Sequence, residues 1–345
     1  MPEQVQIAVV GAGLIGRQHL RLITSDALCR LVAVVDPAAE AADLARSYGV
    51  PWFADLDQML AAVSPAGAIV ATPTALHGEH GMKLLAAGIP VLIEKPIAHD
   101  LQSAEQLVVA AERSNVPLLV GHHRRYSDFI RRARAVIVDG TLGRLVSINA
   151  LTWFLKPTEY FRAAWRRKGG GGPVRINAIH AIDDMRTLTG AEIVTIQAQL
   201  SSATRGFEVE DSAAVLLEFS NGVLGTMSIS DTVASPWNWE MTSAENAAYP
   251  RTSEACYLIG GTTASLSVPD LRLWRHAQPS WMSPIMSSSL DRSSEDPLVR
   301  QLQHFRQVIR REVSALVGGR DAMATLAATL AISHAARAGR RIRIS

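Results

Sequence analysis

The sequence predicts an α/β fold with a doubly wound parallel sheet, followed by an α+β domain with a large, mostly antiparallel open sheet. Two observations support the first half. Short apolar runs alternate with helical segments as far as Gly121, and a glycine motif separates the first run from the first helix. Such alternation is typical of parallel sheets with right-handed crossovers. After residue 121, two-residue alternation and hairpin turns replace this pattern. We therefore place the domains at residues 1–121 and 122–345.

The first element is an apolar strand, Val5–Val10, followed at once by the motif Gly11–Gly16 and by a helix over Arg17–Ser25. A second apolar strand, Leu31–Val35, ends at Asp36, which lies 20 residues beyond Gly16. This is G-x-G-x-x-G in the context that dinucleotide binding requires, with a strand before it, a helix after it and an acid further on.

The residue types of this motif suit a dinucleotide. Gly11 allows a tight turn, Gly13 lets the backbone approach a pyrophosphate, and Gly16 lets helix and strand pack closely. The helix start, which includes Leu14 and Ile15, offers N–H groups and partial positive charge to phosphates. Asp36 can accept hydrogen bonds from the ribose hydroxyls. The alternative is a glycine-rich turn that holds no ligand.

The remaining elements of the first half repeat the same alternation. The expected helices and strands are Ala38–Tyr48, Trp52–Phe53, Leu56–Val63, Ala68–Ala71, His77–Ala87, Val91–Ile93, Leu101–Arg113 and Leu118–Gly121. Ligands of such sheets lie at the carboxyl ends of the strands. Two strand ends, Thr72-Pro73 and Glu94-Lys95-Pro96, therefore join the glycine motif as predicted cofactor contacts, and we expect His77 to lie near the nicotinamide end.

The second half reads as an antiparallel sheet with helices on one face. Alternation and turn residues predict strands over Val146–Thr152 and Val194–Leu200 and two hairpins, Ala213–Ser230 and Cys256–Val268. Apolar periodicity predicts helices over Phe129–Val138, Val174–Leu188, Leu298–Val313 and Ala322–Ala338. The serine-rich stretch Ser283–Ser294 is expected to be a mobile loop, and Arg340–Arg343 an exposed final strand.

Lys95 is the first candidate catalytic residue. Pro96 cannot continue a central strand and fixes the turn, which would aim Lys95 at the cofactor. A lysine there can donate to a substrate oxygen, or act as a base if its pKa is lowered. The alternative is a strand-end lysine paired with Glu94.

His180 is the second candidate, on the helix that follows the glycine run Gly169–Gly172. Asn177, His180 and Asp183 recur at helical spacing and so share one stripe. Imidazole, with an ordinary pKa of about 6.5, exchanges protons near neutral pH, and an aspartate can orient it or bind substrate. The alternative is a packed helix face whose polar groups are satisfied.

Together these motifs resemble the glucose–fructose oxidoreductase/inositol dehydrogenase/MocA (Gfo/Idh/MocA) family. The matching pieces are the glycine motif, Thr72-Pro73 with His77, Glu94-Lys95-Pro96, the run Gly121–Tyr126, and the glycine run that leads to His180 and Asp183. The resemblance implies an NAD(P)-dependent oxidoreductase acting on a sugar, a polyol such as inositol, or a related cyclic alcohol. It places the family's catalytic lysine at Lys95 and its histidine at His180.

One position departs from the family pattern. Many members carry an aspartate four residues before the histidine, where this chain has Ile176, and Asn177 is the nearest polar residue. Either His180 works with Lys95 alone, or Asp183 supports it. Arg124 and Asn177 complete the predicted substrate-binding set. Within enzymes, a dihydrodiol dehydrogenase and an NAD-assisted sugar lyase or glycosidase are alternatives; outside enzymes, a nucleotide-sensing binding protein is the alternative.

Composition limits the remaining choices. A net charge of +2 does not suggest a nucleic-acid partner, and two cysteines in 345 residues do not suggest a disulfide framework. We see neither a signal peptide nor an apolar run of membrane-spanning length, and we expect a cytoplasmic protein without a metal site. Asp36 would repel a 2′-phosphate, so NAD is favoured over NADP. A homodimer or homotetramer is expected through the outer face of the second sheet.

Overall fold

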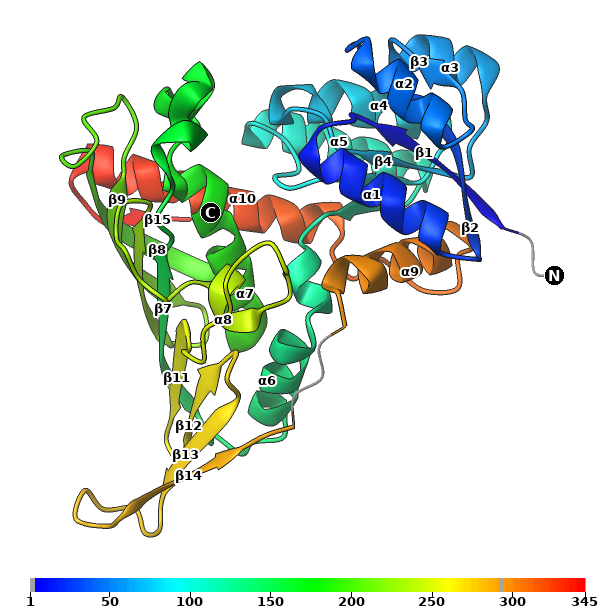
Figure 1. Ribbon diagram of the computed structural model, residues 1–345. Helices are drawn as coiled ribbons and strands as arrows, with labels where there is room; N and C mark the ends of the chain where they lie inside the picture. The colour runs from blue at the N-terminus through cyan, green and yellow to red at the C-terminus, as the bar shows by residue number, and fades with distance from the viewer. Residues whose placement is uncertain (1–3, 292–294, 345) are drawn as a thin grey trace. The chain divides into compact units, whose positions relative to one another are not determined.

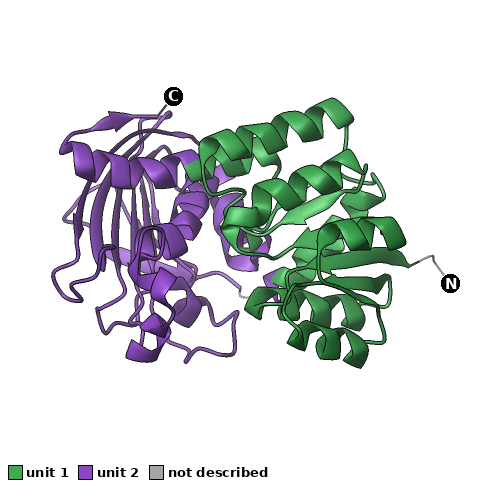
Figure 2. Ribbon diagram, turned by 90° about the horizontal axis from the view of Figure 1, so that it is seen from above, with its two compact units in different colours: residues 1–123, 298–326 green, residues 124–297, 327–345 purple. Residues whose placement is uncertain are grey.

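The computed structural model describes residues 4–291 and 295–344, and it divides into two compact units. The first unit contains residues 1–123 and 298–326, and the second contains residues 124–297 and 327–345 (Figure 2). The chain therefore changes unit between His123 and Arg124, and it returns to the first unit for a segment near its end. The predicted fold class, a doubly wound parallel domain followed by an α+β domain, is confirmed.

The first unit is built on a six-stranded parallel sheet with the order β3-β2-β1-β4-β5-β6 (Figure 1). The strands are β1 (Val5–Val10), β2 (Cys29–Val35), β3 (Trp52–Phe53), β4 (Gly67–Val70), β5 (Val91–Ile93) and β6 (Leu118–Val120). These strands are apolar almost throughout because both faces of the sheet are covered. The strand order reverses between β1 and β4, which is where doubly wound sheets bind their ligands.

Helices cover both faces of this sheet. They are α1 (Leu14–Ser25), α2 (Glu40–Ser47), α3 (Leu56–Ala62), α4 (His77–Ala86), α5 (Leu101–Ser114) and α9 (Pro297–Ile309). Side chains of α1, α2 and α9 share one core cluster with alternate residues of the strands. On the opposite face, α4 packs so closely on α5 and β5 that a Cβ at Gly81 would lie 2.6 Å from Leu107 and 2.7 Å from Ile93. The helix α9 was expected to close the chain, and it is a part of this first core.

The second unit contains a nine-stranded sheet with the order β14-β13-β12-β11-β7-β10-β9-β8-β15. Its strands are β7 (Leu145–Trp153), β8 (Ile193–Ser201), β9 (Ser212–Phe219), β10 (Leu224–Ser230), β11 (Tyr257–Gly261), β12 (Ser265–Val268), β13 (Arg272–His276), β14 (Ile285–Ser289) and β15 (Ile342–Arg343). Neighbouring strands run antiparallel except β7 and β10, which are parallel. The two predicted hairpins, β9–β10 and β11–β12, form as expected.

Helices of the second unit pack on one face of this sheet (Figure 1). They include α6 (Asp128–Val138), α7 (Ile179–Thr189), α8 (Trp239–Ser243) and α10 (Gly319–Ala338). The first part of α10, up to residue 326, belongs to the first unit, and the rest belongs to the second. Short helical turns lie at η3 (Thr158–Arg162) and η4 (Ala164–Arg167), and a π-helical turn, η5 (Val174–Ala178), runs directly into α7. One core cluster joins α6, α7 and α10 to the inner face of the sheet.

One sequence expectation about this unit was wrong, and the structure refines another. The stretch Ser283–Ser294, expected to be a loop, contains the strand β14, which pairs with β13; residues 292–294 lie outside the described residues. All five residues of β14 are exposed, so the strand has no buried face to produce an alternating pattern. The helix expected over Val174–Leu188 begins as a π-helical turn, and its α-helical part starts only at Ile179.

Candidate active site

The first group of candidate residues begins with the glycine motif between β1 and α1, in the first unit. Gly11 has a φ of +99°, and a Cβ there would lie 2.6 Å from the backbone of Ala71, at the end of β4. A Cβ on Gly16 would lie 2.0 Å from the Gly11 carbonyl oxygen. By contrast, a Cβ built on Gly13 meets no described atom within 4 Å. Two glycines therefore permit internal packing, and the third keeps the space above the motif open.

The start of α1 is left available for an anion. Among the described residues, no side chain caps Gly13, and no acid lies in the first turn of the helix. Leu14, in that turn, is 87% exposed. The N–H groups of a helix start carry partial positive charge and favour phosphate groups. This geometry matches the pyrophosphate site that the sequence predicts.

Asp36 shapes the same loop. Its Oδ2 accepts a hydrogen bond from the Ala12 N–H at 2.7 Å, and its Oδ1 accepts one from the Ala38 N–H at 2.9 Å. A carboxylate has about four acceptor positions, so these two bonds leave others for ribose hydroxyls. Asp36 therefore orders the glycine loop and retains capacity for the adenosine ribose.

Lys95 lies in a turn that begins at the end of β5 and contains a cis Lys95–Pro96 peptide. Glu94, directly before it, is buried, and its Oε1 lies 2.8 Å from Nε2 of His19 on α1. A Cβ at Gly121 would lie 2.9 Å from the Glu94 carboxylate, so this glycine makes room for it. Burial acts to raise the pKa of Glu94, but the hydrogen bond and charge of His19 outweigh it and hold that pKa below its usual value. Glu94 thus has a buried partner other than Lys95.

Thr72 and His77 follow the end of β4. His77 is the first residue of α4 and is 1% exposed, and its ring nitrogens contact the backbone carbonyl oxygens of Thr72 and Pro96. His80, one turn on, lies 3.3 Å from the Thr72 hydroxyl. The two strand-end turns that the sequence singled out, Thr72-Pro73 and Glu94-Lys95-Pro96, are thus linked through one histidine.

A second group of candidate residues lies on η5 and α7, in the second unit. A Cβ at Gly172 would lie 2.2 Å from the Glu210 carboxylate, and this carboxylate accepts a hydrogen bond from the Val174 N–H at 2.9 Å. The glycine run therefore brings the start of the helix against Glu210, in agreement with the close approach expected from the sequence. A π-helical turn is uncommon and occurs frequently at functional sites, and here it contains Asn177 and leads directly to His180.

Asn177 and His180 differ in their surroundings. His180 is 7% exposed. The Asn177 side-chain oxygen is buried and finds no hydrogen-bond partner among residues 4–291 and 295–344. A buried amide oxygen without a partner costs free energy, so such an oxygen is an available acceptor for a ligand hydroxyl.

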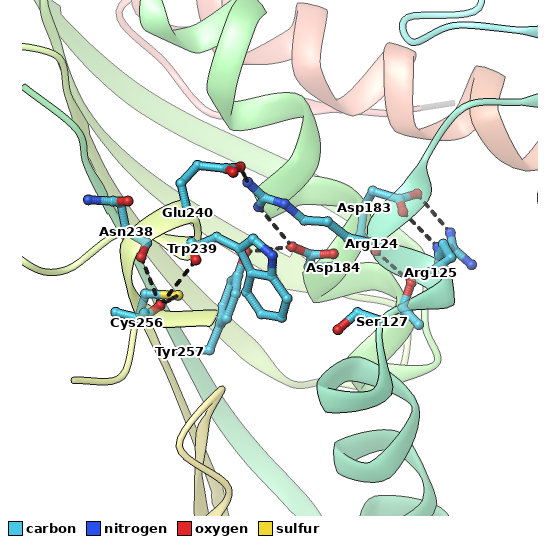
Figure 3. A network of polar contacts seen from close by, with 12 residues as sticks. Arg124, Arg125, Ser127, Asp183, Asp184, Asn238, Trp239, Glu240, Cys256 and Tyr257 are labelled. Carbon is cyan, nitrogen blue, oxygen red and sulfur yellow. Dashed lines mark hydrogen bonds and ion pairs between the residues drawn. The ribbon is translucent and has the colours of Figure 1, made fainter. Parts of the chain in front are cut away.

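Asp183 and Asp184 are held by the adjacent arginines Arg124 and Arg125 (Figure 3). Arg125 donates to both carboxylate oxygens of Asp183, at 2.7 and 2.8 Å. Arg124 donates to Asp184 at 3.2 Å and to Glu240 at 2.9 Å. Both aspartates are almost fully buried, so these pairs anchor α7 to the segment that precedes α6.

A tyrosine completes this network. Tyr257 donates from its hydroxyl to Asp184 at 2.7 Å, and Trp239 lies under the Arg124 guanidinium, 5.3 Å from ring centroid to Cζ (Figure 3). Burial raises the pKa of Asp184 to about 6, against the opposing charge of Arg124. Burial also raises the pKa of Glu245, which accepts hydrogen bonds from Ser127 and Trp239, to about 7. Part of this network therefore titrates near neutral pH.

The comparisons with known proteins decide the family. A family model described as "Oxidoreductase family, NAD-binding Rossmann fold" matches residues 5–122, and the "GFO/IDH/MocA C-terminal domain" model matches residues 130–266. This chain belongs to the Gfo/Idh/MocA family of oxidoreductases. Its first unit is accordingly an NAD-binding Rossmann domain.

Several relatives from this family are similar to the chain. The inositol 2-dehydrogenase of Arthrobacter sp. is 32% identical over 241 residues, which are 66% of this chain and 68% of that protein. The scyllo-inositol 2-dehydrogenase (NAD(+)) of Bacillus subtilis is 26% identical and spans 100% of this chain and 97% of its own. The rhizopine catabolism protein MocA of Rhizobium meliloti is 30% identical over 228 residues, 65% of this chain and 70% of that protein.

Solved structures share the fold over the full length. The WlbA dehydrogenase of Bordetella pertussis, in complex with NADH and UDP-GlcNAcA, has a TM-score of 0.80 at 23% identity and covers 99% of both chains. GenD2 from gentamicin A biosynthesis, in complex with NAD, has a TM-score of 0.80 at 24% identity, over 100% of this chain and 97% of its own.

The predicted site residues of this family member fall into two groups. One gathers at the carboxyl edge of the Rossmann sheet: Gly11, Gly13, Leu14, Ile15, Gly16, Asp36, Thr72, Pro73, His77, Glu94, Lys95 and Pro96. The other gathers around η5 and α7: Arg124, Asn177, His180 and Asp183. Within the described ranges, no group of three or more His, Cys, Asp and Glu side chains is arranged to hold a metal. In the same ranges, none of the helices has the length and hydrophobicity of a membrane-spanning segment.

The sequence analysis did not identify four residues that contact the candidate site residues or residues close to them in the chain: His19, Glu210, Glu240 and Tyr257. His19 had a signal, since it lies on the buried stripe of α1 with Gly16, Leu20 and Ile23, where a polar residue needs a partner. Glu210 lies in a loop, Glu240 on α8 and Tyr257 on β11, each more than 30 residues along the chain from its partner. Nothing in their local sequence marks them.

Proposed function

We propose that this chain is an NAD-dependent dehydrogenase that oxidises a secondary hydroxyl of a polyol or sugar, with inositols as the first candidates. Two of its relatives are named inositol 2-dehydrogenases and cover about two thirds or more of the chain. The family itself consists of oxidoreductases. The proposal extends the substrate class in the names of these relatives to this protein.

The observation that carries the proposal is the open, uncapped start of α1 beside Asp36. The residues present fit NAD, because the N–H groups of the helix start would hold the pyrophosphate and the Asp36 carboxylate would accept hydrogen bonds from the ribose. When bound, NAD supplies the acceptor for a hydride. The protein's share of the work is to orient the substrate and to take up the hydroxyl proton.

For proton transfer, we assign His180 as the acceptor and Lys95 as the donor that fixes the substrate oxygen. An imidazole is suited to accept a proton near neutral pH, whereas a lysine would need a strongly lowered pKa to do so. The Glu94 carboxylate, directly before Lys95, lies 2.8 Å from Nε2 of His19. Asn177 is proposed to bind a further substrate hydroxyl through its buried oxygen, for which no described residue is a partner.

Arg124 and Asp183 are proposed to act through the position of α7. Arg124 is 6% exposed and Asp183 is 1% exposed, and both are engaged in ion pairs. Their geometry supports an orienting role for the helix that carries Asn177 and His180. Direct substrate contact by either residue would require it to leave its present partner, at a cost of several kcal/mol for a buried pair.

We further propose that the protein is a cytoplasmic homodimer or homotetramer that associates through the outer face of the nine-stranded sheet. Leu258, Asn149, Thr226 and Leu216 are paired across four strands and therefore share that face. Leu216 and Leu258 are 54% and 55% exposed there, and Leu224, two residues before Thr226 on β10, is 60% exposed. Light scattering at micromolar concentration tests this, and a monomer would contradict it.

The function is tested by following NADH formation with the purified protein, NAD and a panel of inositols, other polyols and sugars. Turnover of at least one cyclic polyol, lost in Lys95→Met, is the expected result. Binding of NADH without turnover across the panel would contradict the proposal and favour a nucleotide-sensing protein.

A further inference from the structure

His77 is enclosed at the carboxyl edge of the Rossmann sheet, between two neighbouring strand-end turns. Its Nδ1 lies 2.7 Å from the Pro96 carbonyl oxygen, and its Nε2 lies 2.9 Å from the Thr72 carbonyl oxygen. Thr72 follows β4 and Pro96 follows β5, and these two strands are paired directly. The imidazole is therefore a bridge between the two turns that the sequence predicts to contact the cofactor.

Both partners of this imidazole are backbone carbonyl oxygens, which only accept hydrogen bonds. A neutral imidazole has one N–H donor and one lone pair, while the imidazolium has two donors. At 2.7 and 2.9 Å both contacts have hydrogen-bond length, and only the protonated ring can make both at once. In either neutral tautomer, one ring lone pair would face an oxygen lone pair inside a buried site.

The surrounding charges set how firmly the proton is held. Burial is the largest influence and leaves the pKa of His77 below its ordinary value of 6.5, although the two carbonyl acceptors and the carboxylate of Glu94 act to raise it. Lys95 opposes protonation through its charge, and the neighbouring His80 faces the same ring. The bridge is therefore complete on the acidic side of the titration and loses one of its two bonds as the pH rises.

Lys95 sits between two histidine-anchored residues. Upstream, Glu94 is 6% exposed and its carboxylate lies 2.8 Å from Nε2 of His19 on α1. Downstream, the Pro96 carbonyl oxygen lies 2.7 Å from Nδ1 of His77. These two contacts restrain the chain on either side of Lys95 and so restrain the backbone from which its side chain extends.

We propose that His77 is a positioning residue for Lys95, an imidazolium bridge that ties the Lys95-Pro96 turn to the Thr72-Pro73 turn. The assignment of Lys95 to the chemistry rests on the proposed function, but the bridge itself does not. His77 is 1% exposed, and its two ring nitrogens contact backbone carbonyl oxygens. Its effect on activity runs through the lysine, and it makes the orientation of that lysine sensitive to pH.

The direct test observes Lys95 without any substrate. The chain has only four lysines, Lys83, Lys95, Lys156 and Lys168, so ¹³C-dimethylation of the full-length protein gives a simple NMR spectrum in which Lys95→Arg identifies the Lys95 signal. We expect the wild-type Lys95 signal to shift with pH as His77 titrates, in addition to its own titration. This inflection should vanish in His77→Gln and persist in His80→Gln, the matched control on the same helix. Persistence in His77→Gln, or its absence from the wild type, would overturn the proposal.

A second measurement needs no variant at position 77 and therefore holds even if His77→Gln does not fold. In ¹⁵N-histidine spectra of the wild-type protein, both ring nitrogens of His77 should be protonated on the acidic side of its titration. A ring that stays a single neutral tautomer through the whole acidic range in which the protein remains folded would refute the bridge.

Activity gives the third measurement. Once a substrate is known, His77→Gln should lower kcat by about 10- to 100-fold, as expected when a catalytic group is displaced by about 1 Å. The Kd for NADH should change by less than about threefold. An unchanged kcat with a lower stability would make His77 only a packing residue. If no substrate is found, the proposed function fails, but the two NMR measurements still test whether His77 forms the bridge.

Discussion

Arg125 donates two hydrogen bonds, of 2.7 and 2.8 Å, to the carboxylate of Asp183. The adjacent Arg124 donates one hydrogen bond of 3.2 Å to Asp184. Two consecutive arginines before α6 are thus matched to two consecutive aspartates on α7. Planar guanidinium groups recognise carboxylates in this two-point manner, which adds geometric precision to the attraction. The helix that carries His180 is therefore anchored at its buried side by charge.

The first prediction concerns this anchor. Arg125→Lys keeps the charge but cannot reach both oxygens of Asp183, so the free energy of unfolding should fall by about 1–3 kcal/mol. Arg46→Lys is the matched control, because Arg46 pairs with Asp43 where both side chains are 77% exposed, and it should change stability by less than about 0.5 kcal/mol. Urea denaturation of both variants measures the free energy of unfolding. Equal losses in the two variants would show that the Arg125–Asp183 pair does not stabilise the fold more than an exposed ion pair.

The second prediction follows from Glu245, whose pKa is raised from 4.5 to about 7 by burial. A carboxyl group that binds its proton more tightly when folded makes the folded state more stable at low pH, and this stabilisation is lost as the pH rises from about 4.5 to about 7. Glu245→Gln should remove this loss and raise stability at pH 8 by about 2 kcal/mol.

The measurement is the free energy of unfolding of the wild type and Glu245→Gln across that pH range. Asp184, with a pKa of about 6, contributes in the same direction, so the slope should become shallower in the variant without disappearing. A slope that is identical in the two proteins would show that Glu245 is ionised in the folded state throughout the range.

The third prediction concerns the choice of cofactor. Asp36 should repel the 2′-phosphate of NADP, and we expect NADH to bind more tightly than NADPH. Asp36→Asn removes the charge but keeps an acceptor for the Ala12 N–H, which Asp36 binds at 2.7 Å. The ratio of the Kd for NADPH to the Kd for NADH should therefore be about tenfold lower in Asp36→Asn than in the wild type, which corresponds to about 1.4 kcal/mol. Equal or tighter binding of NADPH by the wild type would contradict the role given to Asp36.

The fourth prediction concerns Lys95. Lys95→Met should abolish turnover but leave the Kd for NADH within about tenfold, because the lysine is assigned to the chemical step and not to cofactor affinity. Fluorescence titration with NADH and an activity assay on the same preparation measure the two quantities. Substantial residual turnover would remove Lys95 from the chemistry.

The Rossmann half could be predicted from sequence because its signals are local. The glycine motif, the strand ends at Thr72 and Glu94 and the turn at Lys95 all lie within short windows whose geometry the neighbouring residues determine. His77 was assigned from its sequence position to the nicotinamide end; the structure shows its ring between two carbonyl oxygens, a contact that depends on how β4 and β5 pair.

In the second unit the local signals were weaker. The helix of His180 was visible from its periodicity, but its π-helical first turn contacts Glu210, which lies 36 residues beyond Val174. Likewise, the hydrogen-bond partner of Asp184 is Tyr257, 73 residues away, and no local pattern connects that strand with α7. The strand β14 lacked an alternating pattern because neither of its faces is buried.

The central claim is that His180 accepts the proton from the hydroxyl that NAD oxidises. The most direct measurement is the pH dependence of kcat for the wild type and His180→Ala on one substrate from the polyol panel. His180→Ala should lower kcat by about 10²–10⁴-fold, the usual worth of general base catalysis, and the acidic limb of the profile should vanish with it. A variant that keeps both the wild-type kcat and the acidic limb would contradict the claim. The role of proton acceptor would then belong to another group, with Lys95 the first to consider.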